Sequence, residues 1–195
     1  MPFGGRLSAM FGQHGASSAS AMLILSTTAL LCFAPHSFST PTIEIQPGVH
    51  LPLVGIGTWQ YNESVAEAAV LSALSMGYEH VDTAAGYPNA AGVARALEGS
   101  GRARASYFIT SKIPGGLNAS AAAAALDANL AALRLTHVDL MLVHFPATWG
   151  GEGGKAARQA EWRALEAFAR AGKARAIGVS HYCRRHIEDL LEEWS

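Results

Sequence analysis

The chain has 195 residues, half of them apolar, and a formal net charge of −1. This length allows one domain with a substantial core, or a shorter domain behind a targeting segment. The near-neutral charge gives no electrostatic basis for binding nucleic acid or an acidic membrane surface, so neither is expected as a partner. The two cysteines, Cys32 and Cys183, are too few for a disulfide framework.

Residues 1–41 differ in composition from the rest of the chain. No acidic residue precedes Glu44, and Arg6 is the only lysine or arginine before it. The uncharged stretch 21–34, AMLILSTTALLCFA, is too short for a membrane span of about 20 residues but suits the apolar segment of a signal peptide. Within it, the sequence CFAP at 32–35 resembles the cleavage region of bipartite plastid leaders in some algae. We expect a targeting leader for the secretory route or a plastid; a disordered segment on a cytoplasmic protein is the alternative.

A regular pattern begins at residue 42, so we assign residues 42–195 to one domain. It opens with a predicted β-hairpin formed by 43–45 and 51–54 around a Pro47-Gly48 turn. Short apolar runs rich in β-branched residues then alternate with helical patterns, as in parallel strands covered on both faces. Five strands are predicted in this way, at residues 55–58, 79–83, 107–112, 138–144 and 175–180.

The helices between these strands are predicted from their ends and their apolar spacing. Residues 64–67, SVAE, have the form of a capping box, and Gly77 stands where a C′ glycine belongs. The sequons at 62–64 and 118–120 are interpreted as helix-start chemistry rather than glycosylation sites. Apolar residues repeat at helical spacing in three further segments, at Leu126, Leu130 and Leu133, at Trp162, Leu165 and Phe168 before Gly172, and at Ile187, Leu190, Leu191 and Trp194.

Alternating strands and helices predict a parallel sheet with right-handed crossovers, hence an α/β barrel or a doubly wound sheet. We expect a (β/α)8 barrel of the TIM type preceded by the hairpin. Five strand–helix units can be counted where a closed barrel has eight, so the expectation is an incomplete barrel. Its first and fifth strands would be unpaired edges.

Four polar side chains lie at or just beyond the carboxyl ends of the predicted strands. Asp82, Lys112 and His144 end the second, third and fourth strands, and Tyr87 follows Asp82 in the next loop. These strand ends converge on one mouth of a (β/α)8 barrel, where the active site is built. The four residues are therefore expected to face one another.

These residue types suit proton delivery to a carbonyl oxygen. A tyrosine has a pKa near 10, and a nearby lysine such as Lys112 is expected to lower that of Tyr87. Asp82 would orient the lysine, and a neutral His144 would hydrogen-bond the carbonyl. The hydride must come from a cofactor, because no side chain supplies one.

Each of these residues also has an ordinary structural interpretation when it is taken alone. Asp82 would be a helix cap, Lys112 a solvated strand end, His144 a core histidine, and Tyr87 a packing residue of a turn. No metal site is expected, because the remaining histidines, His50, His80, His137 and His186, show no metal-ligand spacing. The glycine-rich segment 149–155, WGGEGGK, lacks the Ser or Thr of a phosphate-binding loop and is interpreted as a lid or insertion beside the pocket.

The ordered motifs resemble the aldo-keto reductase family from residue 43 to about residue 194. The segment LVGIGTW at 53–59 is similar to the family's opening, and GYEHVDTAAGY at 77–87 to its Asp–Tyr signature. ITSK at 109–112 and VDLMLVH at 138–144 resemble the lysine and histidine strands. GKARAIGVS at 172–180 resembles the strand that reaches the nicotinamide.

The resemblance implies NADP(H)-dependent reduction of a small aldehyde or ketone, with Tyr87 as general acid, Asp82 and Lys112 tuning it, and His144 orienting the carbonyl. It further implies contacts of Thr58, Asp82, Ser180 and His181 with the cofactor, and of Trp59 and Phe145 with the substrate. One position departs from the family, which usually has asparagine where this chain has His181. Histidine lacks the paired donor and acceptor of an amide.

Three functional hypotheses follow from these observations. The first is an NAD(P)H-dependent carbonyl reductase. The second is a non-catalytic binding or regulatory relative, and the third is a fragment without a function of its own, because the units expected to hold the cofactor phosphates are missing from the pattern. No stable membrane span is expected, and the sequence carries no signal for an oligomeric state.

Overall fold

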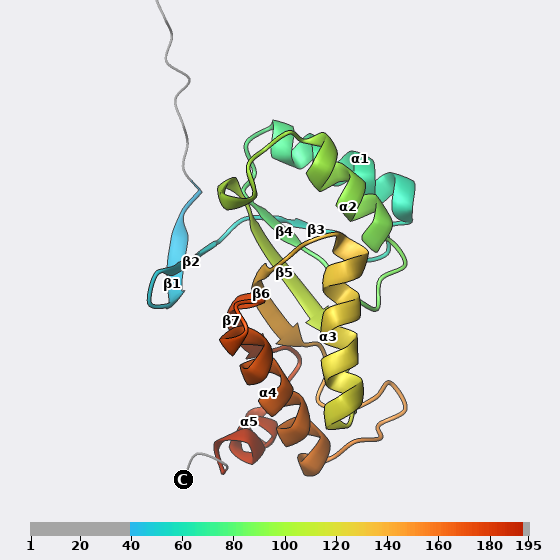
Figure 1. The fold of residues 1–195 in the computed structure, drawn as a ribbon, viewed down its shortest axis with the longest axis vertical. Helices are drawn as coiled ribbons and strands as arrows, with labels where there is room; N and C mark the ends of the chain where they lie inside the picture. Colours follow the sequence, from blue (N-terminus) through green and yellow to red (C-terminus); the bar gives the residue numbers. More distant parts are fainter. Residues whose placement is uncertain (1–39, 193–195) are drawn as a thin grey trace, which may run out of the picture. The chain divides into compact units, whose positions relative to one another are not determined.

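Seven strands and five α-helices follow one another along residues 40–192, the part of the chain that the computed structural model describes (Figure 1). These residues belong to one unit, Phe38–Ser195. The predicted leader, apart from its last two residues, and the predicted packing residue Trp194 lie outside the described residues.

The predicted hairpin is confirmed. Strands β1 (Thr42–Gln46) and β2 (Val49–Pro52) pair antiparallel, and Gly48 takes a φ of +75°, a conformation that glycine adopts without strain. His80 links this hairpin to the main sheet, with Nδ1 3.1 Å from the Pro52 carbonyl oxygen and Nε2 2.9 Å from Thr110 Oγ1. His80 is thus a structural histidine that joins the hairpin to the sheet.

The five predicted parallel strands are confirmed to within one or two residues at each end. They are β3 (Ile56–Gly57), β4 (His80–Asp82), β5 (Phe108–Ile113), β6 (Val138–Val143) and β7 (Ala174–Val179), and they pair in that order. Every neighbouring pair is parallel. The carboxyl ends of all five strands therefore lie at the same edge of the sheet, where the polar residues were expected to meet.

The helices follow one another round one face of the sheet (Figure 1). They are α1 (Glu63–Ser75), α2 (Ala90–Gly99), α3 (Ala119–Leu133), α4 (Lys155–Arg170) and α5 (Arg184–Leu191), with a 3-10 turn, η1 (Arg104–Ser106), before β5. This strand and helix order is that of the predicted (β/α)8 type, present here as five units. Within residues 40–192, no helix is long and apolar enough to cross a membrane.

Two helices begin at the asparagines of the two sequons. Asn62 and Asn118 accept the backbone N–H of Val65 and Ala121, each at 2.9 Å, and so cap α1 and α3. The helix-start interpretation of the sequons is confirmed. The predicted capping box starting at Ser64 is wrong by two residues, because an amide side chain at residue 62 reaches the free N–H groups first.

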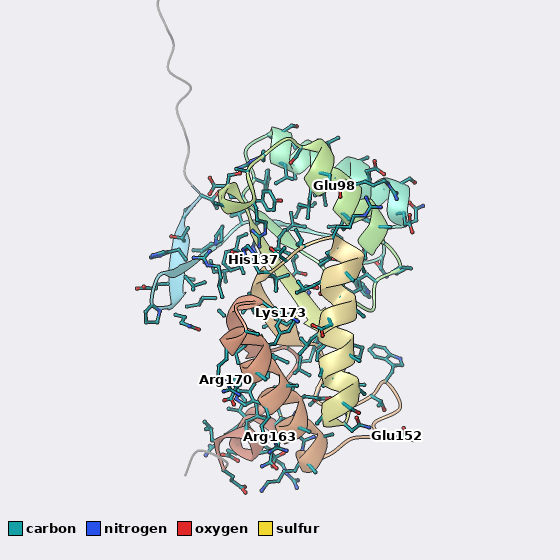
Figure 2. The ribbon with its side chains drawn as sticks, viewed as in Figure 1. Glu98, His137, Glu152, Arg163, Arg170 and Lys173 are labelled. Carbon is teal, nitrogen blue, oxygen red and sulfur yellow. The ribbon has the colours of Figure 1, made fainter. Side chains whose placement is uncertain are left out.

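The helices are held to the sheet by their predicted apolar faces. Leu126 and Leu133 of α3 and Leu165 of α4 are almost completely buried, and each stabilises the fold by about 1.5–3 kcal/mol. Arg163 and Arg170, on the same α4, are exposed (Figure 2). The apolar spacing therefore predicted correctly which side of these helices meets the core.

A buried carboxylate joins the amino-terminal ends of three strands, away from the predicted site. Asp139 of β6 accepts from Arg104 at 2.6 Å, from Arg175 at 2.9 Å and from the backbone N–H of Ile109 at 2.8 Å. Its side chain is only 3 % exposed, so this charge depends on its partners rather than on water. In a barrel, polar groups at this end serve stability rather than chemistry.

Candidate active site

Asp82 and Lys112 form an ion pair at the carboxyl ends of adjacent strands. Asp82, the last residue of β4, pairs in register with Thr110, so Lys112 lies two residues further along β5 on the same face. Lys112 Nζ donates to Asp82 Oδ1 at 2.6 Å and to the Thr83 carbonyl at 2.9 Å. Lys112 is buried, whereas the Asp82 side chain is 38 % exposed. The alternative interpretations of a solvated lysine and a helix-capping aspartate are therefore wrong.

Tyr87 lies beside this ion pair. The loop after β4 turns back through a Tyr87 N–H to Ala84 carbonyl bond, and Lys112 Nζ lies 5.5 Å from the centre of the Tyr87 ring. Burial and the Asp82 carboxylate raise the pKa of Tyr87. The predicted net lowering of this pKa is wrong, because burial, first, and the Asp82 carboxylate, second, set its direction. Tyr87 is thus held protonated, with a cation next to its ring.

His144 completes the group from the next strand. It follows β6 directly, its backbone N–H donates to the Ile113 carbonyl at 2.9 Å, and its ring centre lies 5.7 Å from that of Tyr87. Burial above all, then the positive charges of Lys112 and His181, lower the pKa of His144 to about 4. The ring is therefore neutral at neutral pH, as the sequence predicted, and has one N–H to donate.

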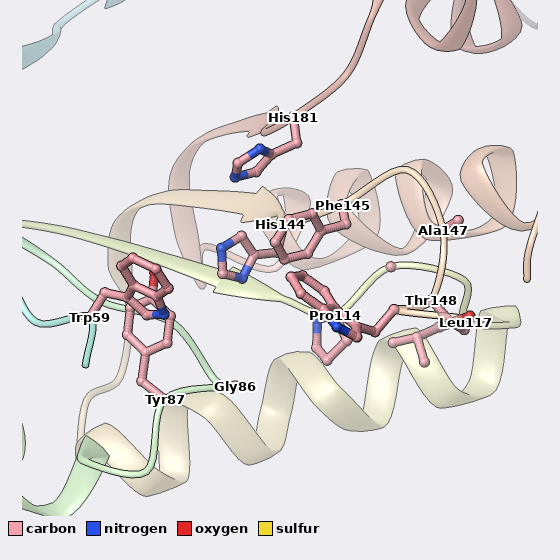
Figure 3. Close-up of a pocket in the computed structure, with 12 residues that line it drawn as sticks. Trp59, Gly86, Tyr87, Pro114, Leu117, His144, Phe145, Ala147, Thr148 and His181 are labelled. Atoms are coloured by element: carbon pink, nitrogen blue, oxygen red, sulfur yellow. The ribbon is translucent and has the colours of Figure 1, made fainter. Parts of the chain in front are cut away.

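These side chains face a pocket of about 780 Å³ with mainly aromatic and apolar walls. Figure 3 shows Trp59 and Tyr87 on one side of it, and His144, Phe145 and His181 on the other. Tyr87 and His144 line the pocket directly, whereas the Asp82–Lys112 pair lies behind them. The pocket is also lined by Gly86, Pro114, Gly115, Leu117, Ala147, Thr148 and Trp149. Of the predicted substrate residues, both Trp59 and Phe145 border it.

Thr58 and Asn89 fix the segment that carries Trp59. The Thr58 hydroxyl donates to Thr83 Oγ1 at 2.9 Å, and Thr58 is completely buried rather than exposed in the pocket. Buried Asn89 donates to the carbonyls of Thr58 and Tyr61, at 2.7 and 2.9 Å. Both residues hold the backbone segment that carries Trp59 through these hydrogen bonds. The role of Asn89 was not predicted from the sequence.

Ser180 and His181 lie where β7 ends. Ser180 is half-buried and its N–H donates to the Val143 carbonyl at 2.8 Å. His181 has a φ of +57°, in the left-handed region where Asn, Asp and His are enriched. Histidine therefore fits the backbone conformation of this position. Its ring stacks on that of Phe145, with centres 4.5 Å apart and 21° between the planes.

The sequence missed the pocket residues of the loop after β5. Pro114, Gly115 and Leu117 line the wall opposite Tyr87, and a Cβ at Gly115 would clash with the Phe145 carbonyl oxygen. The Pro-Gly-Gly sequence directly after the lysine strand was the available signal, because glycine marks a close backbone approach. The interpretation of the glycine-rich segment after β6 as lying beside the pocket is confirmed at Trp149, which lines it.

No group of three or more His, Cys, Asp or Glu side chains that could hold a metal ion occurs within residues 40–192. The polar side chains that line the pocket instead include the protonated Tyr87 and the neutral His144, with the Lys112 ammonium 5.5 Å from the centre of the Tyr87 ring. A parallel α/β sheet with these groups at its carboxyl edge defines the class of (β/α) barrel proteins with an acid–base site at the barrel mouth.

Comparison with known proteins identifies the family within this class. The sequence profile of the aldo/keto reductase family matches residues 53–195. Glyoxal reductase of Bacillus subtilis is 38 % identical over 154 residues, which cover 78 % of this chain and 53 % of the relative. The chain belongs to the aldo/keto reductase family. It spans about half the length of the curated relatives it matches.

Solved structures agree with this assignment. An aldo/keto reductase from Brucella melitensis superposes with a TM-score of 0.74 at 36 % identity, over 80 % of this chain and 58 % of that one. A Bombyx mori aldo-keto reductase solved in complex with NADP gives a TM-score of 0.69 at 29 % identity, over 79 % of this chain and 54 % of that one. The parallel strands and helices described above are therefore the family's barrel units.

Proposed function

We propose that this protein reduces small aldehydes or ketones to alcohols with NADPH. The observation that carries the proposal is the pairing of a protonated tyrosine with a buried lysine and a neutral histidine at one pocket. Tyr87 and His144 are 5.7 Å apart by their ring centres, and Lys112 lies 5.5 Å from the Tyr87 ring. Family membership supports the same reaction.

Each group has a distinct task in this proposal. The neutral ring of His144 donates a hydrogen bond to the substrate carbonyl and places its oxygen near Tyr87. Tyr87 then transfers its proton to that oxygen as negative charge develops on it. Lys112 stabilises the resulting phenolate through its positive charge, and Asp82 holds the ammonium in place at 2.6 Å. Lys112 thus stabilises negative charge that is absent before the reaction and develops on Tyr87 as its proton leaves.

The residues present fit a nicotinamide cofactor. The stacked rings of Phe145 and His181 form a flat aromatic wall next to His144, suited to a planar ring. Ser180 at the end of β7 and the half-exposed Asp82 offer polar contacts to the carboxamide and the ribose. NADPH, when bound, supplies the hydride that no side chain can supply. The complex of the Bombyx mori relative with NADP supports this choice of cofactor.

The pocket favours small carbonyl compounds with an apolar or compact body. Its polar groups are gathered at Tyr87 and His144, while Trp59, Phe145 and Trp149 supply aromatic walls. The names of two relatives, glyoxal reductase and methylglyoxal reductase, suggest dicarbonyls as first substrates to test.

The experiment is an assay of the full-length gene product that follows the absorbance of NADPH on addition of glyoxal, methylglyoxal or a simple aromatic aldehyde. Oxidation that depends on the carbonyl compound and is lost in His144→Gln supports the proposal. His137→Gln is the matched control, because His137 lies at the other end of β6. A folded protein that binds NADPH but oxidises it with none of these compounds would instead support a non-catalytic relative.

We further propose that residues 1–41 form a leader that directs the protein to the secretory route or a plastid. The absence of acidic residues before Glu44 and the apolar stretch at 21–34 support this. A fluorescent protein fused to residues 1–41 should leave the cytoplasm, and a uniformly cytoplasmic fusion would contradict the proposal.

A further inference from the structure

Two charged side chains of α4 are buried behind the pocket. Arg158 and Glu161 are one helical turn apart, so they point from the same side of α4. Glu161 is completely buried and Arg158 is 9 % exposed. Burying charge is costly unless it is paired, so side chains of this kind in a helix that otherwise packs through Leu165 and Phe168 require an explanation.

Glu161 holds the pocket wall that follows β5. Its Oε1 accepts the backbone N–H of Leu117 at 2.5 Å, and the neighbouring N–H of Gly116 also favours the charged carboxylate. Gly116 has a φ of +78°, which turns successive N–H groups toward one side. Leu117 and Gly115, on either side of Gly116, line the pocket. The carboxylate therefore fixes this wall from outside the cavity.

Arg158 holds the second wall, which follows β6. It donates to the Pro146 carbonyl at 3.1 Å, between the pocket residues Phe145 and Ala147. The same guanidinium is anchored to Asp189 of α5, with Nε 3.0 Å from Oδ2. The two walls also touch directly, since there is no room for a Cβ between Gly115 and Phe145. One helix thus holds both loops of the pocket.

We propose that Glu161 is a positioning residue that, together with Arg158, sets the separation of the two pocket walls and thereby substrate binding. The part that concerns substrate rests on the proposed function. Glu161 touches neither the pocket nor the reacting groups, so it acts only through the loop that it holds. Its second oxygen, Oε2, is buried without a hydrogen-bond partner in the described part of the chain, so all of its anchoring runs through Oε1.

The strength of this anchor depends on the charge of Glu161. Burial raises the pKa of Glu161 to about 7, against the opposing effect of the Leu117 and Gly116 N–H groups and Arg158. Tyr182 also faces Glu161, and burial together with the Glu161 carboxylate raises the pKa of Tyr182. Above neutrality the carboxylate accepts charge-assisted bonds from the loop, and below neutrality these bonds weaken. The wall should therefore loosen as the pH falls through neutrality.

The test follows the Leu117 amide by NMR in protein labelled with 15N-leucine, across a pH range that spans neutrality. Its proton resonance should move in one transition with a midpoint near pH 7, because the hydrogen bond strengthens as Glu161 ionises. Glu161→Gln should remove the transition. Glu166→Gln, a matched change on the same helix, should leave it intact. A Leu117 resonance unaffected by pH in the wild-type protein would overturn the proposal even if Glu161→Gln fails to fold.

Steady-state kinetics supply the second measurement. Glu161→Gln should raise KM for the carbonyl substrate by roughly tenfold and leave kcat within about twofold, because the loop binds substrate but the reacting groups are unchanged. A fall in kcat of roughly tenfold with an unchanged KM would contradict the positioning role. A wild-type protein without any turnover would count against the proposed function, and the Leu117 titration would still decide the role of Glu161.

Discussion

Lys112 Nζ lies 2.6 Å from Asp82 Oδ1, and the two side chains differ sharply in their access to water. The lysine is 8 % exposed at its side chain and the aspartate 38 %. A buried ammonium is thus neutralised by a carboxylate that keeps part of its hydration. This arrangement holds a positive charge next to Tyr87 at a lower desolvation cost than a pair buried on both sides.

Replacing Lys112 with methionine should therefore lower turnover strongly while changing the stability of the fold only slightly. The unfolding free energy should change by less than about 2 kcal/mol, because Asp82 can recover water when its partner is lost. Turnover should fall by at least roughly 100-fold, because the developing phenolate loses its cation. Urea unfolding and steady-state rates measure the two effects. A loss of activity fully explained by unfolding would contradict the role given to Lys112.

Asp139→Asn should lower the stability of the fold and leave the activity of the folded protein unchanged. The substitution leaves Arg104 and Arg175 without their shared buried carboxylate, and we expect a loss of roughly 2–3 kcal/mol in unfolding free energy. The pocket lies at the other edge of the sheet, so the kinetic constants of the folded fraction should be unchanged. Thermal unfolding and rates measured well below the transition provide the comparison. An altered KM would show that the two ends of the sheet are coupled.

His144 should stay neutral across the physiological pH range. Its pKa is lowered from 6.5 to about 4, so the folded chain binds fewer protons than the unfolded chain between these values. The stabilising contribution is present above pH 6.5 and is lost as the pH falls through about 4. The imidazole Cε1 proton, assigned by its absence in His144→Gln, should not titrate near neutrality. A midpoint near 6.5 would contradict the environment described for this ring.

The pH dependence of the stability contributed by Glu161 is opposite to that of His144. Its pKa rises from 4.5 to about 7 on folding, so the folded chain binds the extra proton more tightly. Stability from this group is present below pH 4.5 and is lost as the pH rises through about 7, by an amount of order 1–3 kcal/mol. The difference in unfolding free energy between wild type and Glu161→Gln should show this slope. A difference that does not vary with pH would contradict the raised pKa of Glu161.

Most of the fold could be predicted because apolar periodicity and helix ends are local signals. The run at Leu126, Leu130 and Leu133 indicated a buried helix face, and the sequons at Asn62 and Asn118 marked helix starts. The order of strands and helices then placed Asp82, Lys112 and His144 at one edge of the sheet. Their approach to one another follows from topology alone, since parallel strands share their carboxyl edge.

The remaining features depend on distances that no local pattern encodes. The pKa of Tyr87 is raised by its burial and then by the Asp82 carboxylate, and neither can be predicted from the local sequence around Tyr87. The role of Glu161 was not predicted, because its partner Leu117 lies 44 positions away in the sequence. The close approach of Gly115 to the Phe145 carbonyl was not predicted either. Such pairings become visible only when the loops after different strands are placed side by side.

The measurement that bears most directly on the proposed site is the rate of carbonyl-dependent NADPH oxidation by Tyr87→Phe in the full-length gene product. Removing the proton donor alone should lower kcat by roughly 10²–10⁴-fold while the affinity for NADPH stays within a few-fold of wild type. Tyr107→Phe, at a buried position directly before β5, controls for loss of a phenol elsewhere in the fold. If Tyr87→Phe retains wild-type turnover, Tyr87 is not the proton donor and the account of the site is wrong.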